Sequence, residues 1–130
     1  MIRDKFLLLG VVLAGVSVGL GAFGAHGLKA LVTEAQLITF ETGVRYQFFH
    51  SFALIFAFFL QDKFNLTNRS SLFFLLGIIL FSGSLYLLSL REILEWSALK
   101  FLGPITPLGG VCFLIGWGLL FFDIYKKAKQ

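Results

Sequence analysis

The chain has 130 residues, of which 58% are hydrophobic and only 14% are charged. Its mean hydropathy of +0.89 is high, since soluble domains are nearer half apolar and a quarter charged. This balance argues against a soluble globular protein, and the length leaves room for one domain only.

Four apolar runs are long enough to cross the hydrocarbon core of a bilayer, which takes about 20 residues. They cover residues 6–25, 44–60, 72–90 and 105–122. Backbone polar groups in lipid must bond within the chain, and strand-like alternation is absent, so each run is predicted to be a helix. The predicted fold is an all-α integral membrane protein, a single membrane domain over residues 1–130 with four transmembrane helices in a compact bundle.

The first run has an alternative interpretation as a signal peptide, because a basic start precedes it and Ala22-Phe23-Gly24 imitates a cleavage site. The run is longer and richer in glycine than a typical signal sequence, so we expect it to remain as a span. Gly15 and Gly19 form a G-x-x-x-G pair, which lets helices approach closely in lipid. We expect the same close packing from small residues in the last two spans, namely Gly77, Ser82, Gly83, Ser84, Gly109, Gly110, Gly116 and Gly118.

The two longer connections are predicted to hold short interfacial helices. Thr33 followed by Gln36 is typical of a capping box, so a helix should begin there and run on into the second span. Residues 91–101 have apolar residues at helical spacing, together with Trp96, which favours a short helix in the interface. Pro104 and Pro107 fall in the first turn of the last span, where proline is tolerated.

Lysine and arginine are unevenly divided between the two sides of the membrane. With four crossings, both termini and the 61–71 connection share one side. That side holds seven of the 11 basic residues: Arg3, Lys5, Lys63, Arg69, Lys126, Lys127 and Lys129. Because cytoplasmic loops are enriched in Lys and Arg, both termini are predicted to be cytoplasmic, in a multi-pass protein of the bacterial inner membrane. The lysines of the tail are typical of membrane anchors, and we expect no nucleic-acid partner.

Residues 19–51 hold the polar chemistry of an otherwise apolar chain. The candidate functional cluster consists of His26, Glu41, Arg45, Tyr46, Gln47 and His50. Ionisable residues at membrane depth are energetically expensive and often functional. Because His26 ends the first span near the start of the second, His26, Arg45 and His50 could converge in one site. The structural alternative is a local Glu41–Arg45 ion pair at i,i+4 spacing, with histidines that only bond across helices.

Three stretches resemble a known family: GAFGAHGL at 21–28, TGVRYQFFHSFAL at 42–54, and GPITPLGG at 103–110 followed by Gly116-Trp117. Together they are similar to the YgdD/YwdK-like family of small membrane proteins, a domain of unknown function with bacterial inner-membrane and mitochondrial members. The resemblance spans essentially the whole chain and implies a four-helix membrane fold without supplying a reaction. It also implies that His26, residues 45–47 and His50 are characteristic positions, together with an outer-side motif of Pro104, Thr106, Pro107, Gly109 and Gly110.

No recognised catalytic motif accompanies the cluster: H-E-x-x-H and G-x-S-x-G are both missing. The single cysteine, Cys112, excludes a disulfide framework and a thiolate metal site. We therefore expect no enzyme, no metal and no cofactor. The favoured function is a non-enzymatic accessory or assembly component, in contact with the bilayer and with another membrane protein or a second copy of itself.

Two further classes of function stay open. An intramembrane set of His, Glu, Arg and Tyr is the usual material of a small channel or carrier for a solute or proton. Against a channel, the inner halves of the spans hold no acidic residue or histidine. The other class is a ligand-binding protein, with haem between His26 and His50, or a quinone or lipid headgroup on Arg45 and Tyr46.

Overall fold

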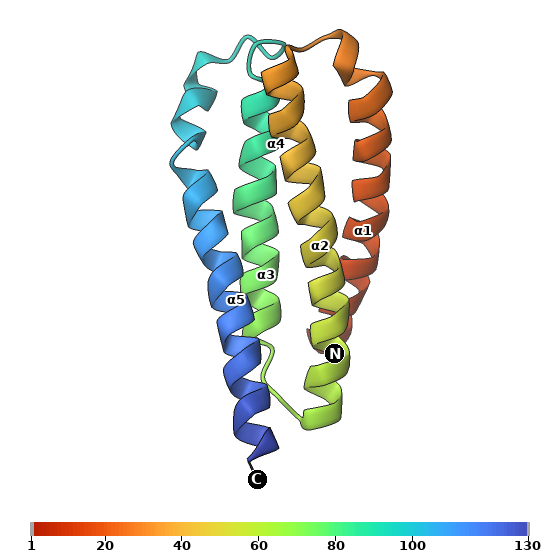
Figure 1. The fold of residues 1–130 in the computed structure, drawn as a ribbon, viewed down its shortest axis with the longest axis vertical. Coiled ribbons are helices and arrows are strands. Elements are labelled where there is room, and N and C mark those ends of the chain that lie inside the picture. Colours follow the sequence, from red (N-terminus) through yellow and green to blue (C-terminus); the bar gives the residue numbers. More distant parts are fainter. Residues whose placement is uncertain (1, 130) are drawn as a thin grey trace.

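The computed structural model describes residues 2–129, so the two end residues of the predicted 1–130 domain lie outside the described part. The regular structure of these residues is helical (Figure 1). The elements are α1 (Ile2–His26), η1 (Leu28–Ala30), α2 (Glu34–Phe64), α3 (Arg69–Gly77), the π-helical η2 (Ile78–Ser82), α4 (Gly83–Leu90), η3 (Ser97–Leu102) and α5 (Ile105–Ala128). Four helical stretches are long and apolar enough to span a membrane, with α3, η2 and α4 forming one of them, which confirms the predicted fold class.

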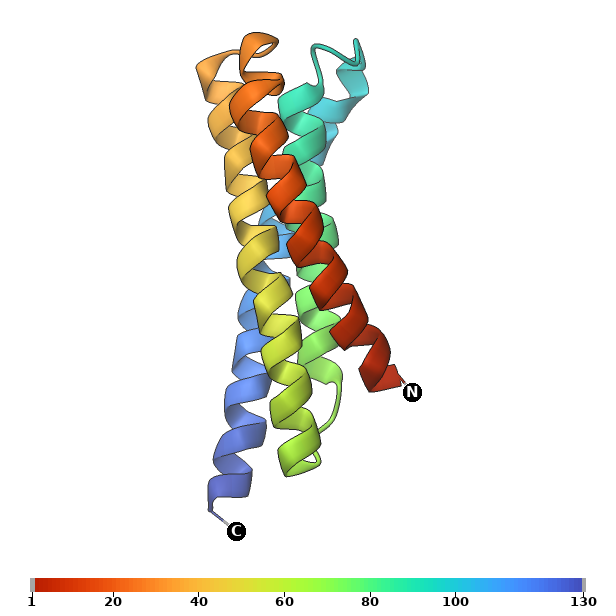
Figure 2. The same cartoon turned by 90° about the vertical axis from the view of Figure 1, so that its right-hand side faces the viewer.

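The four spans lie side by side, with α1 and α5 at opposite edges and α2 and α3–α4 between them (Figure 1). Figure 2 shows that α1 crosses α2 obliquely rather than running parallel to it. The start of α1 and the end of α5 lie toward the same end of the bundle, as four crossings require. A core of Ala53, Leu54, Ala57, Phe74, Ile78, Phe113 and Leu120 joins α2, α3, η2 and α5.

Glycines bring α5 into contact with α3 and η2. A Cβ added at Gly109 would overlap the backbone nitrogen of Phe81 and lie 2.7 Å from its Cα. A Cβ at Gly116 would lie 2.7 Å from the ring of Phe74, and one at Gly77 would overlap the ring of Phe113. Glycine is thus required where these helices meet, as the small residues of the last two spans predicted.

The G-x-x-x-G pair of α1 does not take part in this packing. A Cβ at Gly15 or Gly19 would meet nothing within 4 Å, and the same holds for Gly83 and Gly118. These four glycines therefore do not bring helices together within the bundle. Instead, α1 approaches α2 through Gly10, where a Cβ would lie 3.0 Å from the carbonyl oxygen of Ser51.

The helix predicted to begin at Thr33 is confirmed, whereas the short helix predicted over residues 91–101 forms only in part. Thr33 caps α2 through a capping box in which its Oγ1 accepts from the Gln36 backbone N–H at 3.3 Å, and α2 then runs unbroken for 31 residues. The helix predicted over 91–101 is wrong in its first half, since residues 91–95 form turns. There Glu95 has a left-handed φ of 51°, which interrupts a helix, and only the 3₁₀ segment η3 follows.

Candidate functional site

Gln47 joins three helices near the middle of the bundle. Its side chain is buried, with 3% of its surface exposed. Its amide Nε2 donates to the carbonyl oxygen of Leu13 in α1 at 3.0 Å, and its Oε1 accepts from the hydroxyl of Tyr86 in α4 at 2.8 Å. A buried amide left without partners would be costly, so these two bonds tie the positions of α1 and α4 to α2.

His50 is also buried, and both ring nitrogens are engaged. Its Nδ1 lies 2.8 Å from the carbonyl oxygen of Tyr46. Because a carbonyl can only accept, Nδ1 carries the proton and Nε2 is left as an acceptor. This Nε2 accepts from the indole N–H of Trp117 in α5 at 3.3 Å, and the imidazole stacks on Phe113 with 3.5 Å between ring centroids. His50 therefore links α2 to α5 and holds no free nitrogen.

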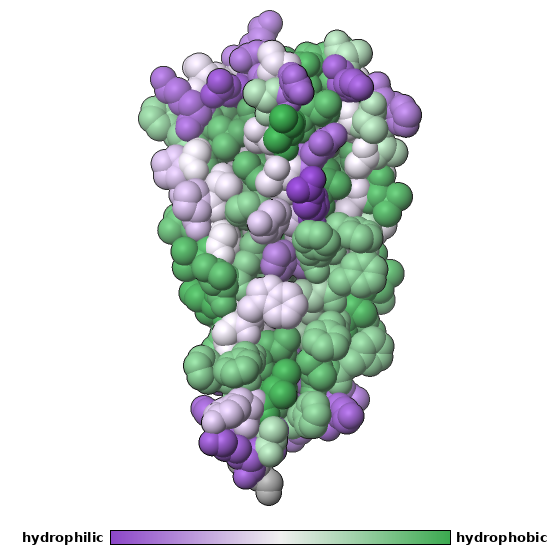
Figure 3. Space-filling model, in the orientation of Figure 1, coloured by the Kyte–Doolittle hydropathy of each residue, from purple (hydrophilic) through white to green (hydrophobic). Residues whose placement is uncertain are grey.

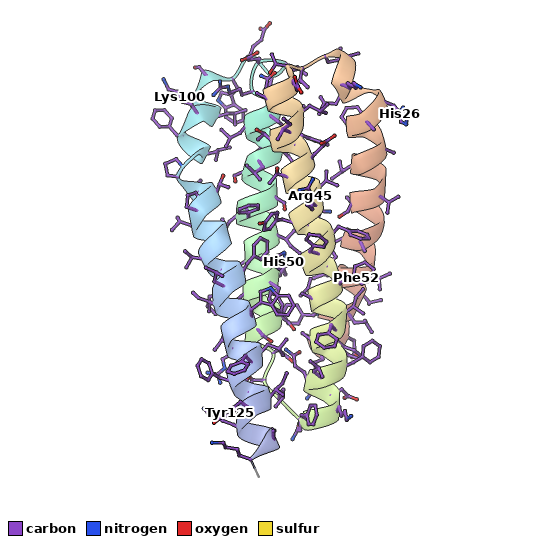
Figure 4. All side chains as sticks on the ribbon, viewed as in Figure 1. His26, Arg45, His50, Phe52, Lys100 and Tyr125 are labelled. Atoms are coloured by element: carbon purple, nitrogen blue, oxygen red, sulfur yellow. The ribbon has the colours of Figure 1, made fainter. Side chains whose placement is uncertain are left out.

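A groove lies beside His50 between α2 and α5, with a volume of about 510 Å³. Its lining is largely aromatic and aliphatic and includes Tyr46 and His50 from α2, Phe81 from η2, and Pro107, Gly110 and Trp117 from α5. Figure 4 shows His50 between α2 and α5, with Arg45 above it on α2. In a membrane, the groove therefore offers an apolar recess reachable from the lipid side of these two helices.

Glu41 and Arg45 are exposed on α2 rather than folded into the bundle. Within residues 2–129 neither side chain has a hydrogen-bond or ion-pair partner, so the alternative of a local Glu41–Arg45 pair is not formed. Figure 3 shows hydrophilic side chains reaching from the upper end of this view toward its middle, with apolar side chains to the right and below. Arg45 lies about 17 Å along the helix from the first residue of α2, by a rise of ~1.5 Å per residue.

The structure does not bring His26 to Arg45 and His50. His26 is the last residue of α1, is exposed, and points away from the bundle (Figure 4). The reason is helical phase, since Gly24 packs toward Phe40 of α2 and a residue two positions later faces nearly the opposite way. The predicted convergence of the three side chains is wrong, and with it the placing of one haem between the two histidines.

The outer-side motif packs α5 and lines the groove. Pro104 precedes the first residue of α5, and the Thr106 hydroxyl lies 2.6 Å from that of Ser84 in α4. Gly109 permits the close contact with Phe81, while Pro107 and Gly110 face the groove.

Several residues that matter to this site were not among the candidates. Tyr86 and Trp117 supply the partners of Gln47 and His50 from positions 39 and 67 residues further along the chain. A second buried set at the other end of the bundle was also missed, in which Gln61 bonds Ser70 at 2.8 Å and Ser71 at 3.1 Å. Gln61 and the two serines lie at the two ends of the polar 61–71 connection, where their polarity is unexceptional, so the sequence held no signal for this set. Among residues 2–129 no group of three His, Cys, Asp or Glu side chains is placed to hold a metal ion.

Comparison with known proteins identifies the family. Residues 20–110 match the family described as "Protein of unknown function (DUF423)". The chain is 46% identical over 116 residues to the UPF0382 membrane protein YwdK of Bacillus subtilis, covering 86% of this chain and 89% of YwdK. It is 39% identical over 130 residues to the UPF0382 inner membrane protein YgdD of Escherichia coli K12, covering 98% of this chain and 95% of YgdD. No solved structure matches the chain. With these relatives and its four spans, the chain belongs to the DUF423 family of inner-membrane proteins.

Proposed function

We propose that this protein is a non-enzymatic accessory component of a larger membrane assembly, and that α1 is the helix that docks a partner. The observation that carries the proposal is the unused face of α1. Only 11% of the residues in the apolar stretch of the first span are buried, against 39% in the second span. A helix held by one neighbour leaves most of its circumference for lipid or for another protein.

The exposed face of α1 has the spacing of a helix-packing seam. Residues Leu8, Val12, Gly15, Gly19 and Ala22 follow one another at steps of four and three, and all five are exposed. That alternation keeps a stripe facing one partner helix, and the small residues at its centre permit close approach in lipid. The 4 Å of open space around Gly15 and Gly19 is what a partner helix would fill.

The use made of the polar residues supports the accessory role over an enzyme. Gln47 is hydrogen-bonded to Leu13 and Tyr86, and His50 is hydrogen-bonded to Tyr46 and Trp117. Neither side chain is therefore free to act as an acid or base. The core supports it over a channel, because Phe74 and Phe113 fill the space between α2 and α5.

Site-specific photo-crosslinking in native membranes tests this proposal. A photoreactive residue at Val12, on the open face of α1, is expected to give a discrete product with a foreign membrane protein. The matched control is Leu114, which is 73% exposed on α5 and should give no discrete product. Gly15→Leu with Gly19→Leu should abolish the Val12 product without loss of folded protein, since neither position has a neighbour within 4 Å. Products that form equally at both positions, or join two copies of this chain, would contradict the proposal.

A further inference from the structure

A second surface, separate from the docking face of α1, has its own chemistry. Along α2, from the end that joins α1 toward the middle of the bundle, come Glu41, then Arg45, then the groove lined by Tyr46 and His50. An anion, a cation and an apolar recess thus follow one another on the lipid side of α2. Figure 4 shows Arg45 above His50, and Figure 3 shows hydrophilic side chains on the upper half of this view.

The two charges are open to a ligand. Both side chains are exposed and have no hydrogen-bond or ion-pair partner among residues 2–129, although an i,i+4 spacing would let them pair with each other. An arginine at this depth is costly unless it reaches a polar group, and a phospholipid phosphate is the anion available at a membrane boundary. The guanidinium fork suits a phosphate better than a point charge does.

The groove below the charges suits hydrocarbon. Its volume of about 510 Å³ lies within the range of about 300–1,000 Å³ that small-molecule sites occupy. Its walls include Phe81, Phe113, Leu114 and Val111, and two of its polar side chains, His50 and Trp117, are bonded to each other. An acyl chain can therefore enter without breaking the bond between His50 and Trp117.

We propose that α2 and α5 bind one zwitterionic phospholipid with a primary ammonium headgroup: the phosphate on Arg45, the ammonium on Glu41, and one acyl chain in the groove. The order of the three protein features is the order of the lipid itself, in which the ammonium lies furthest from the bilayer centre and the chains lie deepest. Glu41 selects the headgroup, because its carboxylate accepts hydrogen bonds from a primary ammonium, whereas the quaternary ammonium of phosphatidylcholine has no N–H to donate and the headgroup of phosphatidylglycerol has no cation. This site goes beyond the proposed accessory role and does not depend on it.

Native mass spectrometry of the purified full-length chain in detergent tests the site. Dioleoyl phosphatidylethanolamine, phosphatidylcholine and phosphatidylglycerol are added separately, so that only the headgroup differs. One phosphatidylethanolamine is expected to remain bound, with at least about fivefold higher affinity than either other lipid. Equal retention of phosphatidylglycerol would overturn the zwitterionic assignment, and equal retention of phosphatidylcholine would overturn the role of Glu41 as a partner of the ammonium.

Variants separate the three parts of the site. Arg45→Gln is expected to weaken all three phospholipids by about tenfold, the value of one charge-assisted contact. Glu41→Gln should abolish the preference for phosphatidylethanolamine over phosphatidylcholine. Gly110→Leu fills the groove and should lower lipid affinity, whereas Gly118→Leu, which enters open space on the same helix, should not. Both charged residues are exposed, so their variants should fold, and unchanged affinity in Arg45→Gln would overturn the proposal.

Discussion

Gln47 shows how this bundle uses a polar side chain. Its amide bonds a backbone carbonyl of α1 and a tyrosine of α4, and it is buried between them. Glu41 and Arg45, six and two residues before Gln47 on the same helix, face outward and bond nothing within residues 2–129. The polar residues of α2 thus divide into internal ties and outward charges, and the two groups respond differently to substitution.

The tie between Gln47 and Tyr86 can be measured by a double-mutant cycle. Gln47→Leu leaves the Tyr86 hydroxyl without its partner, while the Leu13 carbonyl keeps the hydroxyl of Ser17 as a donor, so we expect the free energy of unfolding in detergent to fall by about 1–3 kcal/mol. Adding Tyr86→Phe removes the orphaned hydroxyl and should recover part of that loss, with a coupling of about 0.6–1.7 kcal/mol. Strictly additive losses would show that the two side chains do not bond.

The polar residues of α2 are evident from the sequence, but which of them are buried and bonded and which are exposed is not. His50 and Ser51 each bond the backbone oxygen four residues earlier on α2, that of Tyr46 and of Gln47. The partners that decide their role lie on other helices, because the side chains of Tyr86 and Trp117 arrive only when α4 and α5 pack. Local spacing holds no information on those contacts.

At the scale of the helix, the same residue type has two roles. Gly109 lies against the backbone of Phe81 in η2, where no side chain can move aside, whereas Gly118, nine residues later on α5, faces open space. Both glycines belong to the closely spaced glycines of α5, so their spacing in the sequence does not distinguish the two roles. Which face a glycine occupies follows from the tilt and rotation of the helices, so the spacing of Gly15 and Gly19 did not show whether the pair packs inside the bundle.

These two glycines make a matched pair for substitution. Gly109→Ala should lower the free energy of unfolding by about 1–3 kcal/mol or more, because its Cβ would overlap backbone atoms of η2. Gly118→Ala should leave stability unchanged or raise it slightly, since alanine favours the helix. Thermal unfolding of both variants in the same detergent compares them, and an equal effect at the two positions would refute the close contact of α5 with η2.

At the scale of the whole molecule, composition and run length were enough to predict four spans, because the bilayer sets the length of each helix. The capping box at Thr33 also placed the start of α2 correctly. The turn at 91–95 was missed, since its left-handed Glu95 has no composition signal comparable to glycine.

The arrangement of charges predicts the orientation of these spans. Single cysteines at Lys5 and Lys127, in a chain with Cys112→Ser, should both be shielded from a membrane-impermeant thiol reagent in intact cells and react once the cells are opened. A cysteine at Lys29, in the opposite connection, should react in intact cells. Labelling at positions 5 and 127 from outside would reverse the predicted orientation, and labelling of only one of them would contradict four crossings.

Native mass spectrometry of protein extracted gently from its own membranes tests most directly whether the exposed face of α1 holds a partner. We predict a fixed mass of this chain with a foreign membrane subunit. That mass should be lost in the Gly15→Leu/Gly19→Leu variant, while the variant chain itself remains folded. A bare chain, or an oligomer of this chain alone, in both the unaltered protein and the variant would contradict the claim.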